Sequence, residues 1–434
     1  MIKMSELSVV ISNTCAYIAL FVFCLIRYKW KNLSTMLAFF YTISSIASLL
    51  LFNFPLYNLT YTADGVITWP AALYLLIVNS LLITAFSNCS IENCRQITNY
   101  NYSLILKIQK FLVICFIIYL VFSFPESIRK FYSGRNLADM RDEIYGVNTS
   151  SNLFIVSLIG RLFGSMSIFL ISTACIKYFI YKKLDKIDIY SIIVYFLLKV
   201  TIVFSMVTRQ TIIFSMFEIV VIVLMFNSCF SSKIKRKIVM LSFVIIIFLG
   251  GIFATISNSR FGGNKQNETL SMLRYTGEAQ LNFMTLLWPD LKEPFCGWGQ
   301  FPLYRRLFGL DYDDGTTREE TTVFNSYIQK KFHYYNPTYI FHGVVGGWVM
   351  NWGFIITFII ALWVNIRFRK CFKSSLKLSF IQIILVIVVS SYIGKGMFYS
   401  DYQNEAGNFM ILYLFILWLY LRKHGYSVNV KELN

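Results

Sequence analysis

Five ionisable residues lie inside long apolar stretches or at the tight turn between two of them. They are Arg161, Lys199, Arg209, Glu218 and Lys395. Ionisable groups within a bilayer are costly and commonly mark substrate or ion sites. Four of the five are cations, so we expect an outward-opening, water-filled cavity for an anionic lipid headgroup, above all a diphosphate. The alternative is that Glu218 pairs with Lys199 or Arg161, while Lys395 extends to the membrane surface.

Further candidates lie in and beside a polar segment of the C-terminal half. Arg274 and Glu278 are four residues apart, so they share one face of a helix. There they would provide a cation and a general base, although a surface ion pair is the alternative. Arg260 adds another cation at the start of the segment. His333 and His342 flank the start of the next apolar stretch, where a structural role is the alternative to a catalytic one.

The composition indicates which kind of protein positions these residues. Of the 434 residues, 56% are hydrophobic and only 14% are charged. A soluble domain carries about 25% charged residues, so this chain lacks the polar residues to cover a surface in water. It is predicted to be an all-α polytopic integral membrane protein.

Apolar runs long enough to cross a bilayer predict about eleven transmembrane helices. The expected spans are 8–26, 35–53, 69–87, 104–125, 153–179, 189–207, 211–227, 238–256, 340–364, 379–399 and 406–421. The five ionisable residues above all fall in the outer half of these spans, and we expect no comparable charge deep in the inner half.

The distribution of basic residues sets the orientation. The formal net charge is +18, and nearly all of this excess falls in the loops after alternate spans, beginning with Arg27, Lys29 and Lys31. Cytoplasmic loops are the basic ones, so the N-terminus is expected outside and the C-terminus in the cytoplasm. The charge is therefore a topology signal, and no nucleic-acid partner is expected.

One connection is too long to be a passive turn. Residues 1–256 are expected to hold helices 1–8, residues 257–339 a large external loop, and residues 340–434 helices 9–11 with a cytoplasmic tail. Within the loop, residues 269–288 have apolar positions at helical spacing, which predicts an amphipathic helix on the outer membrane face.

Neither a disulfide framework nor a metal site is expected. Cys89 and Cys94 lie in an expected cytoplasmic loop, and no nearby histidine completes a metal set. The chain lacks Walker A, G-x-S-x-G and H-E-x-x-H motifs. No cofactor is therefore expected, and the energy for any reaction would arrive with an activated lipid substrate.

The layout resembles the Wzy-type oligosaccharide repeat-unit polymerases of O-antigen and capsule synthesis. The resemblance covers most of the chain: about eleven spans with one large external loop between late spans. Shorter segments that carry it are NLADMRDEIY (136–145), Thr208–Gln210, Ser259–Phe261, RYTGEAQLNF (274–283) and PTYIFHGVVGGWVMNWGF (337–354). At Asn351-Trp352-Gly353 many relatives have an Asp-containing step, so no catalytic role is assigned there.

The resemblance implies glycosyl transfer on the outer face of the bacterial cytoplasmic membrane, from one undecaprenyl-diphosphate-linked glycan to the next repeat unit. Glu278 is then the first candidate base and His342 the second. The candidate substrate-binding residues are Arg161, Lys199, Arg209, Arg260 and Arg274. Implied partners are the lipid-linked glycans, membrane lipids and a chain-length-regulating co-polymerase.

Three other functions remain open. An O-antigen ligase has a similar layout and donor but a lipid A-core acceptor. A lipid-linked oligosaccharide flippase should have more spans, inverted halves and no long loop. A membrane acyltransferase should have an early histidine motif, whereas all three histidines here follow residue 330.

Overall fold

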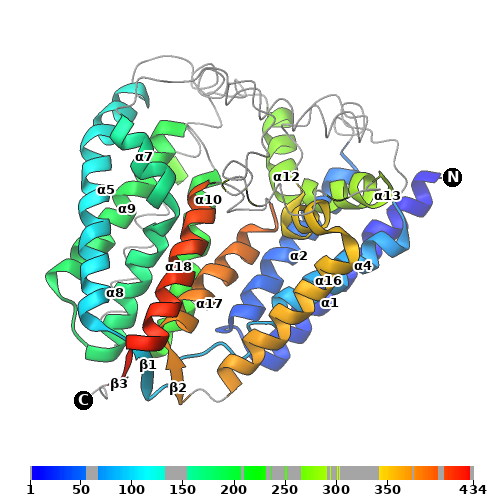
Figure 1. Ribbon diagram of the computed structural model, residues 1–434. Coiled ribbons are helices and arrows are strands. Elements are labelled where there is room, and N and C mark those ends of the chain that lie inside the picture. The colour runs from blue at the N-terminus through cyan, green and yellow to red at the C-terminus, as the bar shows by residue number, and fades with distance from the viewer. Residues whose placement is uncertain are drawn as a thin grey trace. The chain divides into compact units, whose positions relative to one another are not determined.

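The computed structural model (Figure 1) describes residues 2–54, 67–131, 154–206, 210–230, 236, 250–251, 265–290, 294, 301, 303, 342–373, 376–398 and 405–430. The chain divides into two compact units, which are described separately. Unit 1 comprises Met1–Cys89, Lys265–Lys370 and Ser390–Asn404, and unit 2 comprises Ser90–Asn264, Cys371–Val389 and Glu405–Asn434.

Most described residues are helical, and seven segments among them are long and apolar enough to cross a membrane. These are Ser5–Tyr28, Leu33–Phe52, Tyr102–Arg129, Val156–Tyr181, Lys186–Ser205, Thr211–Cys229 and Gly343–Phe372. Two shorter apolar helices, α4 (Trp69–Thr84) and α17 (Phe380–Lys395), occupy two more of the expected spans. Helix α18 (Glu405–His424) occupies the expected last span. The expected span 238–256 lies almost wholly outside the described residues.

The long helices keep large apolar side chains on their outer faces. On α5 (Tyr102–Phe131), Phe111, Ile114 and Val121 are 52%, 58% and 61% exposed. Ile26 and Ile355 are 79% and 78% exposed. A helix on the surface of a soluble protein carries polar residues on such a face. These faces therefore suit lipid, as the composition predicted.

Unit 1 is built on α1 (Ile2–Tyr28), α2 (Leu33–Phe52), α4 and α16 (Gly343–Lys373). Helix α1 packs on α2 and α4. A polar helix, α12 (Lys265–Asn282), packs along α2 and continues through a π-helical turn, η3 (Phe283–Leu287), into the short α13 (Trp288–Asp290). Helix α16 is kinked at Gly353, whose φ of +75° breaks the helical path.

Unit 2 is built around α5, α8 (Ser167–Tyr181) and α9 (Lys186–Met206), with α9 packed against the other two. The segment α7 (Phe154–Phe163) joins α8 through a 3₁₀ turn, η1 (Gly164–Met166), and packs on α18. Helix α10 (Gln210–Phe226) ends in a second 3₁₀ turn, η2 (Asn227–Cys229). Lys182 adopts a left-handed φ of +54° that ends α8.

A small sheet in unit 2 was not predicted from the sequence. Strand β1 (Gln96–Tyr100) is central, with β2 (Lys377–Ser379) parallel on one side and β3 (Tyr426–Asn429) antiparallel on the other. Strand β1 is hundreds of residues from the other two along the chain, and the strands have only three to five residues each. Such short strands leave little periodic signal in a sequence.

Candidate functional site

Helix α12 approaches α2 closely because Gly277 has no side chain. A Cβ atom added at Gly277 would lie 2.4 Å from the Ser48 backbone nitrogen and 2.5 Å from the Ala47 carbonyl carbon. Ser44 Oγ donates to the Thr276 carbonyl at 2.7 Å, and Ser48 Oγ donates to the Gly277 carbonyl at 2.6 Å. The small residue and the two hydroxyl contacts together fix where α12 sits on α2.

The burial of α12 differs from the predicted amphipathic pattern. Residues 266–276 are exposed or partly exposed, whereas every residue from 277 to 284 is buried. A helix lying on a membrane surface would bury one face along its whole length. The second half of α12 is instead buried within the protein at every position from 277 to 282, and its main helix contact is with α2. Of the expected loop 257–339, the structure describes only residues 265–290, 294, 301 and 303.

Arg274 and Glu278 form a two-point ion pair on α12. Arg274 Nε lies 2.9 Å from Glu278 Oε2, and Nη2 lies 3.1 Å from Oε1. The side chains are only 15% and 5% exposed, respectively. The alternative of a surface ion pair is therefore wrong: this pair is largely removed from water. Breaking such a pair by removing one partner is strongly destabilising, by about 3–5 kcal/mol.

The surroundings of Glu278 make its carboxylate a stronger proton acceptor than an exposed one. Burial raises the pKa of the Glu278 carboxyl, while the charge and hydrogen bonds of Arg274 and a hydrogen bond with Asn282 lower it. Burial is the largest influence, so the pKa is raised overall. A base whose pKa lies nearer to neutral takes up a proton more readily in a transition state.

Three small residues bring other candidates near this pair. A Cβ atom added at Gly343 would lie 2.8 Å from the Gly396 carbonyl oxygen and 3.6 Å from Ala279 Cβ. Gly343 also has a φ of +62°, which a larger residue rarely adopts. Glu278 precedes Ala279 and His342 precedes Gly343 in the chain, so both candidate bases lie one residue from this contact.

Buried polar side chains hold the rotation of α12 beside the site. Asn13 Nδ2 donates to Gln280 Oε1 at 3.1 Å and to Ser45 Oγ at 3.4 Å. Gln280 Nε2 donates at 3.4 Å to both the Tyr41 carbonyl and Ser44 Oγ. Polar groups in an apolar interior are favourable only when they are hydrogen-bonded. These contacts therefore favour one orientation of α12 against α1 and α2.

In unit 2, Lys199 is neutralised by a neighbouring carboxylate. Lys199 Nζ lies 2.9 Å from Glu218 Oε2, and Tyr195 Oη donates to the same oxygen at 2.7 Å. The sequence left this pairing open, and its presence favours a structural role for Lys199. Arg161 is exposed on α7.

The seven candidate residues are not all placed by the structure. Arg274, Glu278 and His342 lie in unit 1, Arg161 and Lys199 lie in unit 2, and Arg209 and Arg260 lie outside the described residues. The structure thus brings Arg274 into contact with Glu278 and places His342 near their helix.

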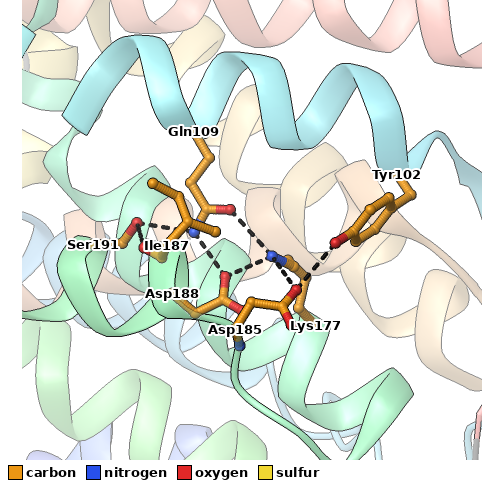
Figure 2. Close-up of polar contacts among 7 residues, drawn as sticks. All are labelled: Tyr102, Gln109, Lys177, Asp185, Ile187, Asp188 and Ser191. Carbon is orange, nitrogen blue, oxygen red and sulfur yellow. Dashed lines mark hydrogen bonds and ion pairs between the residues drawn. The ribbon is translucent and has the colours of Figure 1, made fainter. Parts of the chain in front are cut away.

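The sequence analysis missed a buried charged network in unit 2 (Figure 2). Lys177 Nζ lies 2.8 Å from Asp188 Oδ1, and these side chains are 1% and 0% exposed. Gln109 Nε2 donates to the same oxygen at 2.9 Å. Asp185 lies 3.5 Å from Lys177 Nζ and accepts a hydrogen bond from Tyr102 Oη at 3.0 Å. The network lies at and between the ends of the expected spans 153–179 and 189–207, so it does not test the expectation that no charge lies deep in the inner half of the spans.

Two sequence features could have revealed this network. Lys177 lies within the expected span 153–179, and Asp185 and Asp188 have the spacing of a helix N-cap and its third helical residue. The Asp185 backbone N–H donates to Asp188 Oδ2 at 2.9 Å, and the Asp188 N–H donates to the Asp185 carbonyl at 3.0 Å. The side chains of this network are paired with one another and join α5, α8 and α9, which indicates a structural role.

No metal centre is assigned. Among the residues that the structure describes, no group of three or more His, Cys, Asp or Glu side chains is placed to hold a metal ion. Cys89 and Cys94 are buried, and burial raises the pKa of the Cys94 thiol. A raised pKa favours the thiol over the thiolate that binds metals.

Comparison of the chain with protein-family models, with curated proteins and with solved structures gave no match.

Proposed function

We propose that this chain is a membrane glycosyltransferase that polymerises undecaprenyl-diphosphate-linked oligosaccharide repeat units into O-antigen or capsular polysaccharide. It would act on the outer face of the bacterial cytoplasmic membrane, with about eleven spans, an outer N-terminus and a cytoplasmic C-terminus. The apolar helices support a lipid-linked substrate, and the resemblance in layout supports the reaction class.

One observation carries the proposal: the polar helix α12, which packs against the apolar helix α2, bears a buried guanidinium–carboxylate pair. Arg274 and Glu278 make two contacts, at 2.9 and 3.1 Å, and Glu278 is 4% exposed. His342 lies near the same helix through the contact of Gly343 with Ala279. Burial of ionisable groups costs desolvation free energy, and such buried groups commonly mark a site of reaction.

The reaction needs a leaving group, a stabilising cation and a base. An acceptor hydroxyl oxygen forms the new bond to the sugar C1 while the bond from C1 to the phosphate oxygen breaks. The electron pair leaves with the lipid diphosphate, whose charge Arg274 helps to stabilise. The hydroxyl proton passes to Glu278, with His342 as the second candidate. No external energy source is required, because the glycosyl diphosphate is already activated.

The test is chain extension of purified lipid-linked repeat units by the full-length protein. Glu278→Gln keeps the size of the side chain but cannot accept the proton, so the rate should fall by about 10²–10⁴-fold. Glu268→Gln, in the first turn of the same helix, is the matched control and should retain normal activity. Equal activity of wild type and Glu278→Gln would remove Glu278 as the base.

The products distinguish the other functions. A polymerase defect leaves glycans one repeat unit long on the cell surface. A flippase defect would trap single units inside, and a ligase defect would leave long chains on the lipid carrier. Accumulation of either of those products in the Glu278→Gln strain would reject the proposed polymerase activity.

A further inference from the structure

Six exposed cations lie at the ends of two helices of unit 1. Three lie at the end of α1 and in the turn after it, and three lie in the last two turns of α16: Arg27, Lys29, Lys31, Arg367, Arg369 and Lys370. Among the residues that the structure describes, none of these six forms a salt bridge with a carboxylate. The segments around them, 20–52, 80–89 and 355–370, contain no Asp or Glu. Their positive charge is therefore not balanced within these segments.

One short segment ties the two groups of cations together. Asn32 Nδ2, at the end of the turn after α1, donates to the Ser87 carbonyl at 2.8 Å. Asn88 Nδ2 donates to the carbonyl of Arg369 in α16 at 3.4 Å. Because Ser87 and Asn88 are neighbours in the chain, the turn after α1 and the end of α16 attach to the same short segment. The six cations therefore share one end of unit 1, which we call the basic surface.

The turn after α1, which carries two of the lysines, is held by its neighbours. Lys29 has a left-handed φ of +66° that ends α1. The Trp30 ring packs against the rings of Phe21 and Phe39, with centroids 6.1 and 5.7 Å away. The side chain of Asn32 then caps the first turn of α2. The backbone of the turn is thus fixed, which keeps its lysines at the basic surface.

Along α16 the exposed side chains change in the order in which a membrane changes from its core to its surface. Ile355, Ile359, Trp363 and Arg367 follow one another at four-residue steps, so they lie on one side of the helix. The first three are 78%, 55% and 59% exposed. Aliphatic side chains suit the hydrocarbon core, tryptophan the interface with water, and Lys and Arg the region beyond it. Each step rises about 6 Å, which places Arg367 one step outside the interfacial tryptophan, among the lipid headgroups.

The end of α1 repeats this order. Ile26 is 79% exposed and precedes Arg27, and Trp30 is 51% exposed between Lys29 and Lys31. A basic face that meets only water, or one that binds nucleic acid, needs no such sequence of aliphatic, tryptophan and basic side chains. Both helix ends therefore present their cations at the level of the lipid headgroups.

We propose that the basic surface binds the phosphate groups of anionic phospholipids in the adjoining leaflet. A zwitterionic headgroup carries its own cation, whereas an anionic headgroup leaves a net negative charge that the six cations neutralise. Arg guanidinium groups bind phosphate through two parallel hydrogen bonds, and Lys ammonium groups bind it as point charges. The interaction does not depend on the proposed glycosyl transfer. Under the orientation proposed above, the leaflet is the cytoplasmic one.

The test measures which lipids the full-length protein retains. Protein reconstituted in nanodiscs with equal amounts of phosphatidylglycerol and phosphatidylcholine is analysed by native mass spectrometry, and the ratio of the two bound lipids is measured. The neutral variant carries Lys29→Gln, Lys31→Gln, Arg367→Gln and Lys370→Gln. The charge-retaining variant carries Lys29→Arg, Lys31→Arg, Arg367→Lys and Lys370→Arg. The matched control, Lys107→Gln with Lys110→Gln, removes two exposed cations from α5 in unit 2.

Wild type should be enriched in phosphatidylglycerol over phosphatidylcholine. Each cation near a charged membrane surface contributes about fivefold to binding, so the neutral variant should lose at least about tenfold of this enrichment. The charge-retaining and control variants should keep most of it. High salt should weaken the enrichment in wild type, because the interaction is between exposed charges.

Equal enrichment in the neutral variant and in wild type would overturn the inference. An equal loss in the charge-retaining variant would also overturn it, because shape rather than charge would then govern binding. Displacement of the lipid by inorganic phosphate would reveal a site for free anions in its place. Thermal unfolding checks that each variant is folded; if the neutral variant does not fold, Lys31→Gln alone must lower the enrichment by about fivefold for the inference to stand. A wild type without preference for phosphatidylglycerol would refute the inference and leave the polymerase proposal untouched.

Discussion

Replacing Gly277 with alanine tests whether the close packing of α12 on α2 positions the residues of the candidate site. The added Cβ would lie 2.4 Å from the Ser48 nitrogen, whereas the optimal van der Waals separation of nonbonded heavy atoms is roughly 3.5 Å. The neighbour is helix backbone, which has no rotamer with which to move aside. Helix α12 must therefore shift by about 1 Å or tilt away from α2.

The magnitude follows from what that shift disrupts. Overpacking of a tight contact destabilises by about 1–3 kcal/mol. The hydroxyl contacts of Ser44 and Ser48 to the α12 carbonyls, now 2.7 and 2.6 Å long, would be stretched or lost, at about 0.5–1.5 kcal/mol each. We therefore expect Gly277→Ala to lower the free energy of unfolding by about 2–6 kcal/mol.

Thermal unfolding and chain extension of the purified variant provide the measurements. Gly160→Ala is the matched control, because a Cβ there would meet only Tyr119 Cε2 at an ordinary 3.6 Å. In a helix that control should be neutral or slightly stabilising. Chain extension should fall in Gly277→Ala, because Arg274 and Glu278 move with α12. A Gly277→Ala protein as stable and as active as Gly160→Ala would refute this account of α12.

Three further predictions address the charges. Arg274→Gln removes the charge and hydrogen bonds that lower the pKa of Glu278, so this pKa rises. The acid limb of the pH–rate profile of chain extension should then move to higher pH. An unmoved limb would contradict Glu278 as the base. Lys177→Met should destabilise unit 2 by about 3–5 kcal/mol. The double variant Lys177→Met with Asp188→Asn should lose less stability than the two single variants lose together. If the losses of stability measured by thermal unfolding simply add, the Lys177–Asp188 pair in Figure 2 is not coupled. Chain extension should continue in EDTA, because Arg and Lys supply the cations; activity lost in chelator and restored by magnesium or manganese would reject that mechanism.

Features that depend on neighbouring residues could be predicted from the sequence. Apolar runs predicted the helices, and within the described part of the chain seven helical segments have membrane-crossing length. The four-residue spacing of Arg274 and Glu278 predicted that they would share a helix face, because 3.6 residues complete one turn. Pairing of Lys199 with Glu218 was one of two options, since two adjacent apolar helices bring such groups together.

Tertiary structure alone decided how far each of these groups is withdrawn from water. The same Arg274–Glu278 spacing suits an exposed helix. In the structure α12 approaches α2 closely at Gly277, and the pair on α12 is only 15% and 5% exposed. Likewise, the meeting of Ala279, Gly343 and Gly396 joins segments more than fifty residues apart. Periodicity records which residues share a face of one helix, but not which other helix covers that face. Burial, and with it the raised pKa of Glu278, is therefore a property of the packed chain.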